Sequence, residues 1–214
     1  MEQTLLPTVL LAVLMIAKTV QGQTPPGLSP STQTHLGLTF GKDIIPPRLG
    51  CPLTKADTTS APLLTLHDVS RDSTYLAFMI DIDVLYQCST TSLLHWYEPD
   101  LKPDIETGSL VASHRTTSAR AEYGGPAPPL GTMHRYVSFL FAQPPDYVFP
   151  EQFMRFMAPT IPARLGFNLS QFVDAAGLDG PVAASYFTVE GSEGTDVAES
   201  RMSVTKSSCF RTQF

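Results

Sequence analysis

Charged residues are scarce in this chain, and basic residues are the scarcer kind. Only 16% of the 214 residues are charged, with 14 Lys and Arg against 20 Asp and Glu, which gives a formal net charge of −6. Nucleic acids and anionic membranes are bound through clustered Lys and Arg, and the sequence contains no basic run. We therefore expect no nucleic-acid partner.

Cysteine is also rare, and the spacings that bind metals or cofactors are missing. The chain has three cysteines and no CxxC pair, GxSxG motif, P-loop or GxGxxG loop. We expect no metal and no cofactor. Three cysteines suit an oxidising compartment in which two of them pair and one stays buried. We expect the disulfide to join Cys51 to Cys209, because that pair would tie both arms to the domain.

The N-terminus carries one long apolar run. Leu5–Ala17 is almost wholly apolar but shorter than the roughly 18–20 residues that span a bilayer. Val20-Gln21-Gly22 offers small or modest side chains at a cleavage site, so residues 1–22 are predicted to be a signal peptide. We expect a secreted protein without a stable membrane anchor. An anchor stays the lesser alternative because of this length, although the segment before the run departs from the usual signal pattern in having Glu2 and no Lys or Arg.

A hydrophobic content of 43% supports one large core, and the 19 prolines favour a sheet protein with long loops over a helical bundle. Residues 38–190 are predicted to form the domain, after a flexible lead-in over 23–37 and before a flexible tail over 191–214. Apolar runs separated by Pro and Gly clusters predict strands. These runs are Leu63–Leu66, Tyr75–Asp83, Ser92–Trp96, Arg135–Ala142 and Val182–Val189.

One short helix is predicted, over about Leu169–Ala176. Asn168 can cap its first turn with Gln171 as the return partner of a capping box, and Gly177 supplies the left-handed residue after the last turn. Asn168-Leu169-Ser170 is also an N-glycosylation sequon in a chain predicted to be exported. A cap with a glycan and a cap without one both stay open.

Two carboxylates and two histidines stand at the ends of strand-like runs. Asp81 and Asp83 are two residues apart, so their side chains point the same way along a strand. His95 lies within an apolar run, and His134 precedes Arg135, whose guanidinium can pair with either carboxylate. Taken singly, such residues more often end a strand or form a satisfied core histidine.

The order of the motifs is more specific than any one of them. The Asp-x-Asp pair is followed by Leu94-His95-Trp96, then Tyr123-Gly124-Gly125-Pro126-Ala127-Pro128-Pro129, then His134-Arg135-Tyr136 and Gly180-Pro181-Val182-Ala183. From about residue 38 to 190 this order resembles the phosphatidylethanolamine-binding protein family, which includes Raf-kinase inhibitor proteins, carboxypeptidase Y inhibitors and plant flowering-time regulators. The runs 93–96, 167–170 and 181–184 look most like its secreted fungal branch.

The resemblance implies a mostly β fold, a β-sandwich with a large antiparallel sheet, a smaller sheet and peripheral helices. It also implies a pocket for an anionic oxygen, with two imidazoles and loop N–H groups as donors. The pocket residues would be Asp81, His95, Gly125, Pro128, His134 and Tyr136, supported by Asp83, Arg135 and Trp96. Ile82 stands where the family usually has a proline, so we expect a retained cavity with an altered ligand preference.

The resemblance leaves the function, and whether the chain is an enzyme, open. The first reading is a secreted module that binds a phosphate- or carboxylate-bearing small molecule or a lipid head group. The alternative is a catalyst or accessory protein of fungal secondary metabolism that promotes dimerisation of maleic-anhydride polyketide monomers, with His95 or His134 as general base. A second alternative is a peptidase inhibitor. The expected partners are therefore an anionic ligand or substrate, and a pathway enzyme or a peptidase. Metal hydrolysis at Asp81, His95 and His134 ranks lower, because the family site is metal-free.

Overall fold

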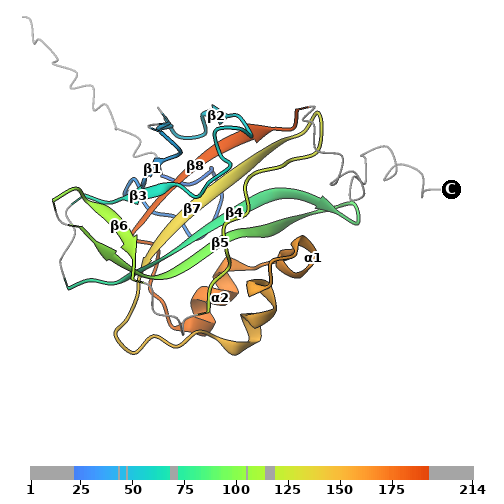
Figure 1. The fold of residues 1–214 in the computed structure, drawn as a ribbon. Coiled ribbons are helices and arrows are strands. Elements are labelled where there is room, and N and C mark those ends of the chain that lie inside the picture. Colours follow the sequence, from blue (N-terminus) through green and yellow to red (C-terminus); the bar gives the residue numbers. More distant parts are fainter. Residues whose placement is uncertain are drawn as a thin grey trace, which may run out of the picture.

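The structure is a computed structural model that describes residues 22–42, 44–46, 48–67, 72–104, 106–113 and 119–192. The predicted signal peptide lies outside these ranges except for Gly22, and so does the predicted tail beyond Ser192. Figure 1 shows the strands and helices that fill the described ranges.

Eight strands in the described part of the chain form one sheet, in the order β1-β3-β6-β5-β4-β7-β8-β2. All neighbours run antiparallel except β2 and β8, which are parallel. The prediction of a mostly β fold is confirmed, with one curled mixed sheet in place of two separate sheets. The strands are β1 (Gly37–Thr39), β2 (Pro52–Leu53), β3 (Leu63–Thr65), β4 (Tyr75–Tyr86), β5 (Ser89–Pro103), β6 (Ser109–Ala112), β7 (Met133–Ala142) and β8 (Ala183–Glu190).

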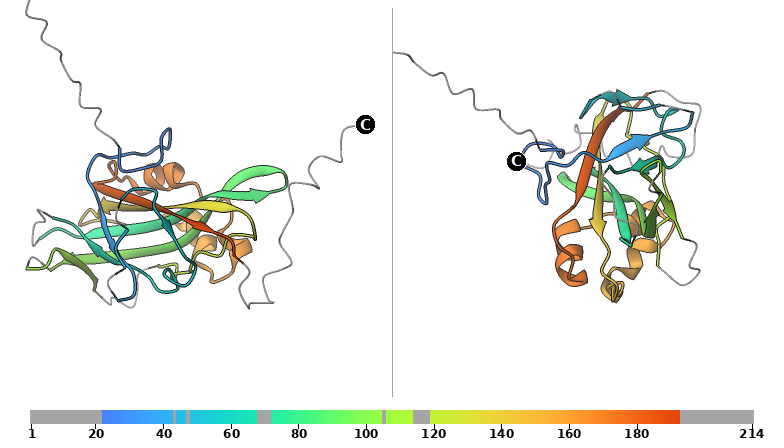
Figure 2. Two further views of the ribbon diagram at one scale, coloured as in Figure 1. Left: turned by 90° about the horizontal axis from the view of Figure 1, so that it is seen from above. Right: turned by 90° about the vertical axis from the view of Figure 1, so that its left-hand side faces the viewer.

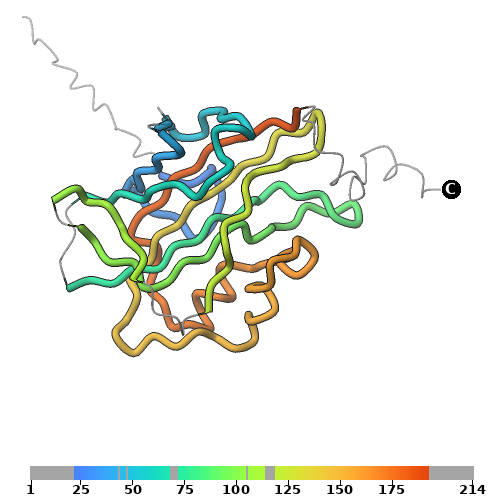
Figure 3. Tube along the Cα trace, viewed as in Figure 1, coloured from blue at the N-terminus to red at the C-terminus, as the bar shows by residue number. Residues whose placement is uncertain are grey.

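The sheet curls until its two ends meet. The N–H of Leu36, just before β1, donates to the carbonyl of Ala184 in β8, and the N–H of Ala184 donates to the carbonyl of Thr34. In Figure 3 and in the right-hand view of Figure 2, the blue N-terminal segment lies beside the orange-red strand β8. Leu36 is fully buried, so the last residues of the expected lead-in belong to the fold.

Apolar side chains fill both faces of the curled sheet, which is why the central strands read as continuous apolar runs. On β4, alternate residues enter two different clusters. Tyr75, Ala77 and Met79 pack inside the curl, whereas Leu76, Phe78 and Ile80 pack on the outer face. Each fully buried aromatic or aliphatic side chain stabilises the fold by roughly 1.5–3 kcal/mol. Asp81, the next residue of the inner series, therefore follows a strand that is anchored on both sides.

In the described ranges, three short helices cover the outer face of the sheet (Figure 1): η1 (Glu151–Met157), α1 (Ile161–Arg164) and α2 (Leu169–Ala176). The predicted helix is confirmed as α2, with Asn168 Oδ1 accepting the Gln171 N–H at 3.0 Å and Gly177 left-handed at φ 61°. Phe172 of α2 packs edge-on against Phe78 of β4, with ring centroids 5.0 Å apart. No helix in the described ranges is long and apolar enough to cross a membrane.

The expected Cys51–Cys209 disulfide is wrong. Cys51 keeps a free thiol and is only 3% exposed, because it lies just before β2 with its carbonyl accepting the Thr188 N–H of β8. A small thiol buried in this way acts as an ordinary core side chain. Cys88, in the turn between β4 and β5, is the cysteine that is disulfide-bonded among those described.

Candidate functional site

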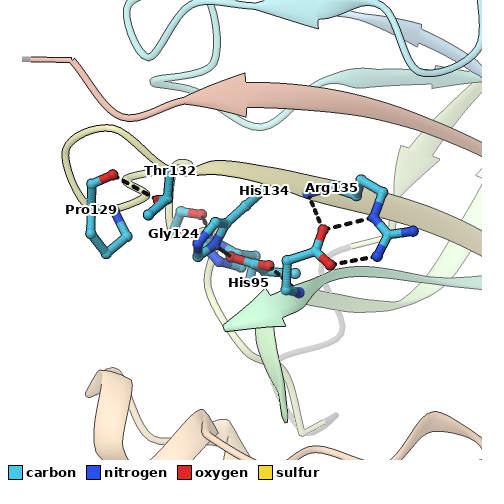
Figure 4. A network of polar contacts seen from close by, with 8 residues as sticks. His95, Gly124, Pro129, Thr132, His134 and Arg135 are labelled. Atoms are coloured by element: carbon cyan, nitrogen blue, oxygen red, sulfur yellow. Dashed lines mark hydrogen bonds and ion pairs between the residues drawn. The ribbon is translucent and has the colours of Figure 1, made fainter. Parts of the chain in front are cut away.

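Asp81 and His134 form a buried pair where β4 and β7 part. Asp81 faces Tyr136 in the last residue pair between these strands, and His134 lies two residues earlier on β7, on the same face as Tyr136. Asp81 Oδ2 lies 2.7 Å from His134 Nδ1, and the two side chains are 3% and 8% exposed. Nδ1 of His134 therefore donates to the carboxylate, which fixes the orientation of the imidazole (Figure 4).

His95 reaches the same place because β5 is bulged beside β4. Met79 pairs with Trp96 and Ile80 with Leu94, which leaves His95 without an opposite residue. Leu94 and Trp96 consequently enter the outer and inner clusters, although residues two apart in a regular strand share one face. A bulge redirects side chains in this way, and the His95 ring meets the Tyr136 ring edge-on at 5.1 Å.

The hydrogen bonds of His95 define which ring nitrogen carries its proton. Nδ1 lies 2.6 Å from the carbonyl oxygen of Gly124, so Nδ1 is protonated and donates (Figure 4). Nε2 is buried and has no hydrogen-bond partner among the described residues. Buried polar atoms are nearly always paired, so an unpaired acceptor beside a second histidine indicates a place for a ligand's donor.

Burial lowers the pKa of His95 below its ordinary value, and the charges of Arg164 and His134 act in the same direction. The hydrogen bond to Gly124 and the charge of Asp81 oppose this shift without overcoming it. The imidazole of His95 is therefore neutral near pH 7, with a free lone pair on Nε2.

Tyr136 links Asp81 to the loop that precedes β7. Its hydroxyl is hydrogen-bonded to the Asp81 carboxylate and to the backbone of Ala127. Burial raises the pKa of Tyr136 above its ordinary value, and the negative charge of Asp81 adds to the effect. The hydroxyl therefore stays neutral, and its one proton is donated to the Asp81 carboxylate.

Arg135 pairs with Asp83, one of the two carboxylates open to it. The Arg135 backbone N–H and Nε donate to Asp83 Oδ2 at 2.8 and 2.7 Å, and a second guanidinium nitrogen donates to Oδ1. β4 and β7 stop pairing after Asp81, so the backbone of β4 offers no acceptor to the Arg135 N–H. The Asp83 side chain accepts that N–H instead. Burial acts to raise the pKa of Asp83, but the hydrogen bonds and charge of Arg135 outweigh it and lower the pKa.

The loop with Gly125 and Pro128 borders the two histidines and is held tightly. A Cβ on Gly125 would lie 3.0 Å from the Thr58 carbonyl oxygen, a tight contact that a larger residue would have to relieve by a small shift. A Cβ on Gly191 would lie 2.0 Å from the Pro129 carbonyl oxygen and 2.6 Å from that of Pro128. The loop is thus clamped between residue 58 on one side and the end of β8 on the other.

The remaining predicted residues have other positions. Trp96 is buried inside the curl, where it meets the ring of Tyr123 edge-on at 6.1 Å. Asn168 lies away from the histidines, in the wall of a surface hollow of about 630 Å³ between η1 and α2. Among the residues that the structure describes, no group of three or more His, Cys, Asp or Glu side chains is placed to hold a metal ion.

Sequence reasoning missed Arg164, the last residue of α1. Its side chain is 6% exposed and donates to the carbonyls of Ala158 and Glu122 at 2.7 and 2.6 Å. Nothing in the local sequence singles out this residue, since Ile161-Pro162-Ala163-Arg164 reads as an ordinary short turn.

Two curated proteins resemble large parts of the chain in sequence. The "Phomoidride biosynthesis cluster protein N" of Talaromyces stipitatus is 44% identical over 185 residues, which cover 81% of this chain and 93% of that protein. A protein of the same name from Fungal sp. is 53% identical over 135 residues, 61% of this chain and 60% of its own length.

Solved structures share the fold at low sequence identity. A carboxypeptidase Y inhibitor, crystallised in complex with its cognate proteinase, gives a TM-score of 0.55 at 20% identity over 76% of this chain and 85% of its own. The phosphatidylethanolamine-binding protein of Plasmodium vivax gives 0.53 at 17% identity over 78% and 92%. The sequence model named phosphatidylethanolamine-binding protein matches residues 38–187. The chain belongs to the phosphatidylethanolamine-binding protein family.

Proposed function

We propose that this chain promotes the dimerisation of maleic-anhydride polyketide monomers in a fungal biosynthetic pathway, with His95 as the general base. The observation that carries the proposal is the buried, unpartnered Nε2 of His95 beside the Asp81–His134 pair. The names of the two similar fungal proteins, both assigned to a phomoidride biosynthesis cluster, favour this function over a general binding role.

The proposed step is an addition that needs no oxidant or reductant. Nε2 of His95 takes a proton from a carbon conjugated with an anhydride carbonyl, and the C–H electron pair moves into an enolate. The enolate carbon forms a C–C bond to an unsaturated carbon of a second monomer. His95 returns its proton to the enolate that this addition creates, so the base is regenerated.

The groups around His95 suit the charge that develops on the anhydride oxygen. His134 is held in place by Asp81 through Nδ1, so its Nε2 would donate to the oxyanion, beside the loop N–H groups, when the ring carries a second proton. The burial of His95, His134 and Tyr136 keeps bulk water away from the reacting atoms. These same donors would hold a carboxylate or phosphate, which is the competing function as a binding module.

Export belongs to the proposal as well. Residues 1–22 would direct secretion, and Asn168, exposed at the start of α2, would then be available for a glycan. Its Oδ1 accepts the Gln171 N–H, which leaves the amide nitrogen for the sugar.

The test is turnover of a purified anhydride monomer in the presence of EDTA, with the parent compared with His95→Gln and His134→Gln. His35→Gln is the matched control, because His35 is exposed and its Nδ1 bonds Gln23. We expect His95→Gln to lower the rate by about 10²-fold or more. The control should keep the parent rate.

Two results would contradict the proposal. Inhibition by EDTA that zinc reverses would replace acid–base chemistry with metal chemistry. A parent protein without turnover that binds phosphate or a dicarboxylate in titration calorimetry, and loses that binding in both site variants, would be a binding module.

A further inference from the structure

Arg164 is a buried cation whose hydrogen bonds all go to backbone carbonyls in the described part of the chain. Nε donates to Ala158, and Nη1 donates to Glu122 at 2.6 Å and to His95 at 3.4 Å. We propose that Arg164 is a positioning residue that fixes the orientation and the tautomer of His95. The consequence for catalysis rests on the proposed function, but the positioning itself does not.

The backbone hydrogen bonding of β5 is irregular on both sides of His95. Toward β4, the bulge leaves His95 unpaired. On the other side, Tyr97 and Ala121 exchange two hydrogen bonds, and the Gly124 N–H donates to the His95 carbonyl at 2.8 Å. Glu122 and Tyr123 therefore both lie opposite Trp96, which makes a second bulge.

Arg164 donates hydrogen bonds at the place where the two bulges interrupt the backbone ladder. The carbonyl of Glu122 lies in the second bulge and receives Nη1 of Arg164, and the same nitrogen also reaches the carbonyl of His95. One guanidinium thus joins β5 to the 121–124 segment where the regular ladder is interrupted. Without the guanidinium the Glu122 carbonyl loses this donor, so the contact holds the segment in one place.

The position of this segment decides the tautomer of His95. Gly124, two residues after Glu122, offers the carbonyl that accepts Nδ1–H of His95. If the segment shifts, Nδ1–H loses its acceptor and the two neutral tautomers become similar in energy. Nε2 is then protonated for part of the time and cannot accept a proton from a substrate.

The charge of Arg164 acts on the same ring. His95 is faced by Asp81 from β4, by His134 and Tyr136 from β7, by the Gly124 carbonyl, and by Arg164 from α1. Burial, Arg164 and His134 lower the pKa of His95, while Asp81 and Gly124 raise it. Removing the cation should therefore raise the pKa of His95 and also free its ring.

The experiment records the ring nitrogens of His95 by ¹⁵N NMR on the folded chain without substrate, across a pH titration. Arg164→Gln removes the charge and the contacts, and Arg164→Lys keeps the charge on a single nitrogen that cannot contact the Ala158 and Glu122 carbonyls together as Nε and Nη1 do. Arg155→Gln is the matched control, since Arg155 is exposed on η1 with its guanidinium 4.2 Å from the centre of the Phe156 ring.

We expect the parent and Arg155→Gln to show Nδ1 protonated and Nε2 unprotonated. Both Arg164 variants should show averaged nitrogen shifts from mixed tautomers, and Arg164→Gln alone should titrate at clearly higher pH. If Arg164→Gln does not fold, Arg164→Lys decides by the same tautomer criterion. Parent-like ring shifts in the folded variants would overturn the proposal.

Measuring kcat and KM shows whether the positioning role of Arg164 or the proposed catalytic function fails. If His95 is the base, Arg164→Gln should lower kcat by about tenfold or more with little change in KM, because a misplaced base affects the reaction step. A parent protein without turnover would contradict the proposed function alone, since the tautomer readout needs no substrate.

Discussion

At the residue scale, the two histidines of the site differ in what their Nδ1 atoms meet. Nδ1 of His95 donates to the carbonyl of Gly124, whereas Nδ1 of His134 donates to the carboxylate of Asp81. A charge-assisted bond to a carboxylate is the stronger of the two, so His134 is the more firmly oriented ring. His95 combines a neutral state with an open acceptor, which suits a base, whereas Nε2 of His134 donates only when that ring carries a second proton.

The pH dependence of the rate follows from the lowered pKa of His95. A general base works in its neutral form, and burial keeps His95 neutral below its ordinary pKa of 6.5. We expect the rate to stay constant as the pH falls through 6.5 and to decline only at lower pH. The measurement is kcat against pH, and a decline centred above pH 6.5 would exclude His95 in this role.

The Asp83–Arg135 pair gives a second prediction at this scale. The lowered pKa of Asp83 means that the pair stabilises the fold above the ordinary Asp pKa of 3.8 and that this contribution is lost as the pH falls below it. Asp83→Asn should cost about 1 kcal/mol at pH 7, a modest value because the pair is partly exposed. The cost should shrink at pH 3 in urea denaturation.

The control for this pair is Asp146→Asn, at an exposed turn position. It should change the free energy of unfolding by less than about 0.5 kcal/mol at both pH values. An equal effect of Asp83→Asn at pH 7 and pH 3 would show that the loss has another cause than the ion pair.

At the element scale, local patterns were the easiest to predict. The five predicted runs correspond to β3, β4, β5, β7 and β8, and α2 has the predicted bounds, with Asn168 as its N-cap and Gly177 left-handed at its end. The short strands β1, β2 and β6 were missed, because two to four residues carry no periodicity. The bulge at His95 was missed too, since it depends on the register with β4 and not on the sequence around residue 95.

The loop before β7 depends on the small size of Gly191. Gly191→Ala would place a Cβ against the carbonyl of Pro129, and overpacking of this kind costs about 1–3 kcal/mol. Gly180→Ala is the control, because a Cβ there meets nothing within 4 Å. Thermal unfolding should separate the two variants, and equal melting temperatures would show that the loop is not clamped as described.

Asn168 has two roles that two substitutions can separate. Asn168→Asp keeps an oxygen for the Gln171 N–H but cannot carry a glycan, whereas Asn168→Ala removes the cap and costs about 1 kcal/mol. In intact-mass analysis of secreted protein, glycosidase should reduce the mass of the parent and leave Asn168→Asp unchanged. A parent that begins at Met1 and keeps its mass after glycosidase would contradict export and glycosylation.

At the scale of the whole molecule, the strand order creates the site. β5, β4 and β7 are neighbours in the sheet, so Asp81, His95 and His134 lie together where β4 and β7 part, and α1 on the outer face adds Arg164. The order of motifs predicted the family and the principal residues, because each motif stands beside a strand. It could not predict Arg164 or the free state of Cys51, because both follow from packing between segments far apart in the sequence.

Proton abstraction by His95 is the central claim, and deuterium exchange tests it without dimerisation. A single anhydride monomer is incubated in D₂O with the parent, His95→Gln or His35→Gln, at a concentration too low for coupling. The parent and His35→Gln should introduce deuterium at the carbon conjugated with the anhydride about 10²-fold faster than His95→Gln. Equal exchange in the parent and His95→Gln would contradict the assignment of His95 as the base.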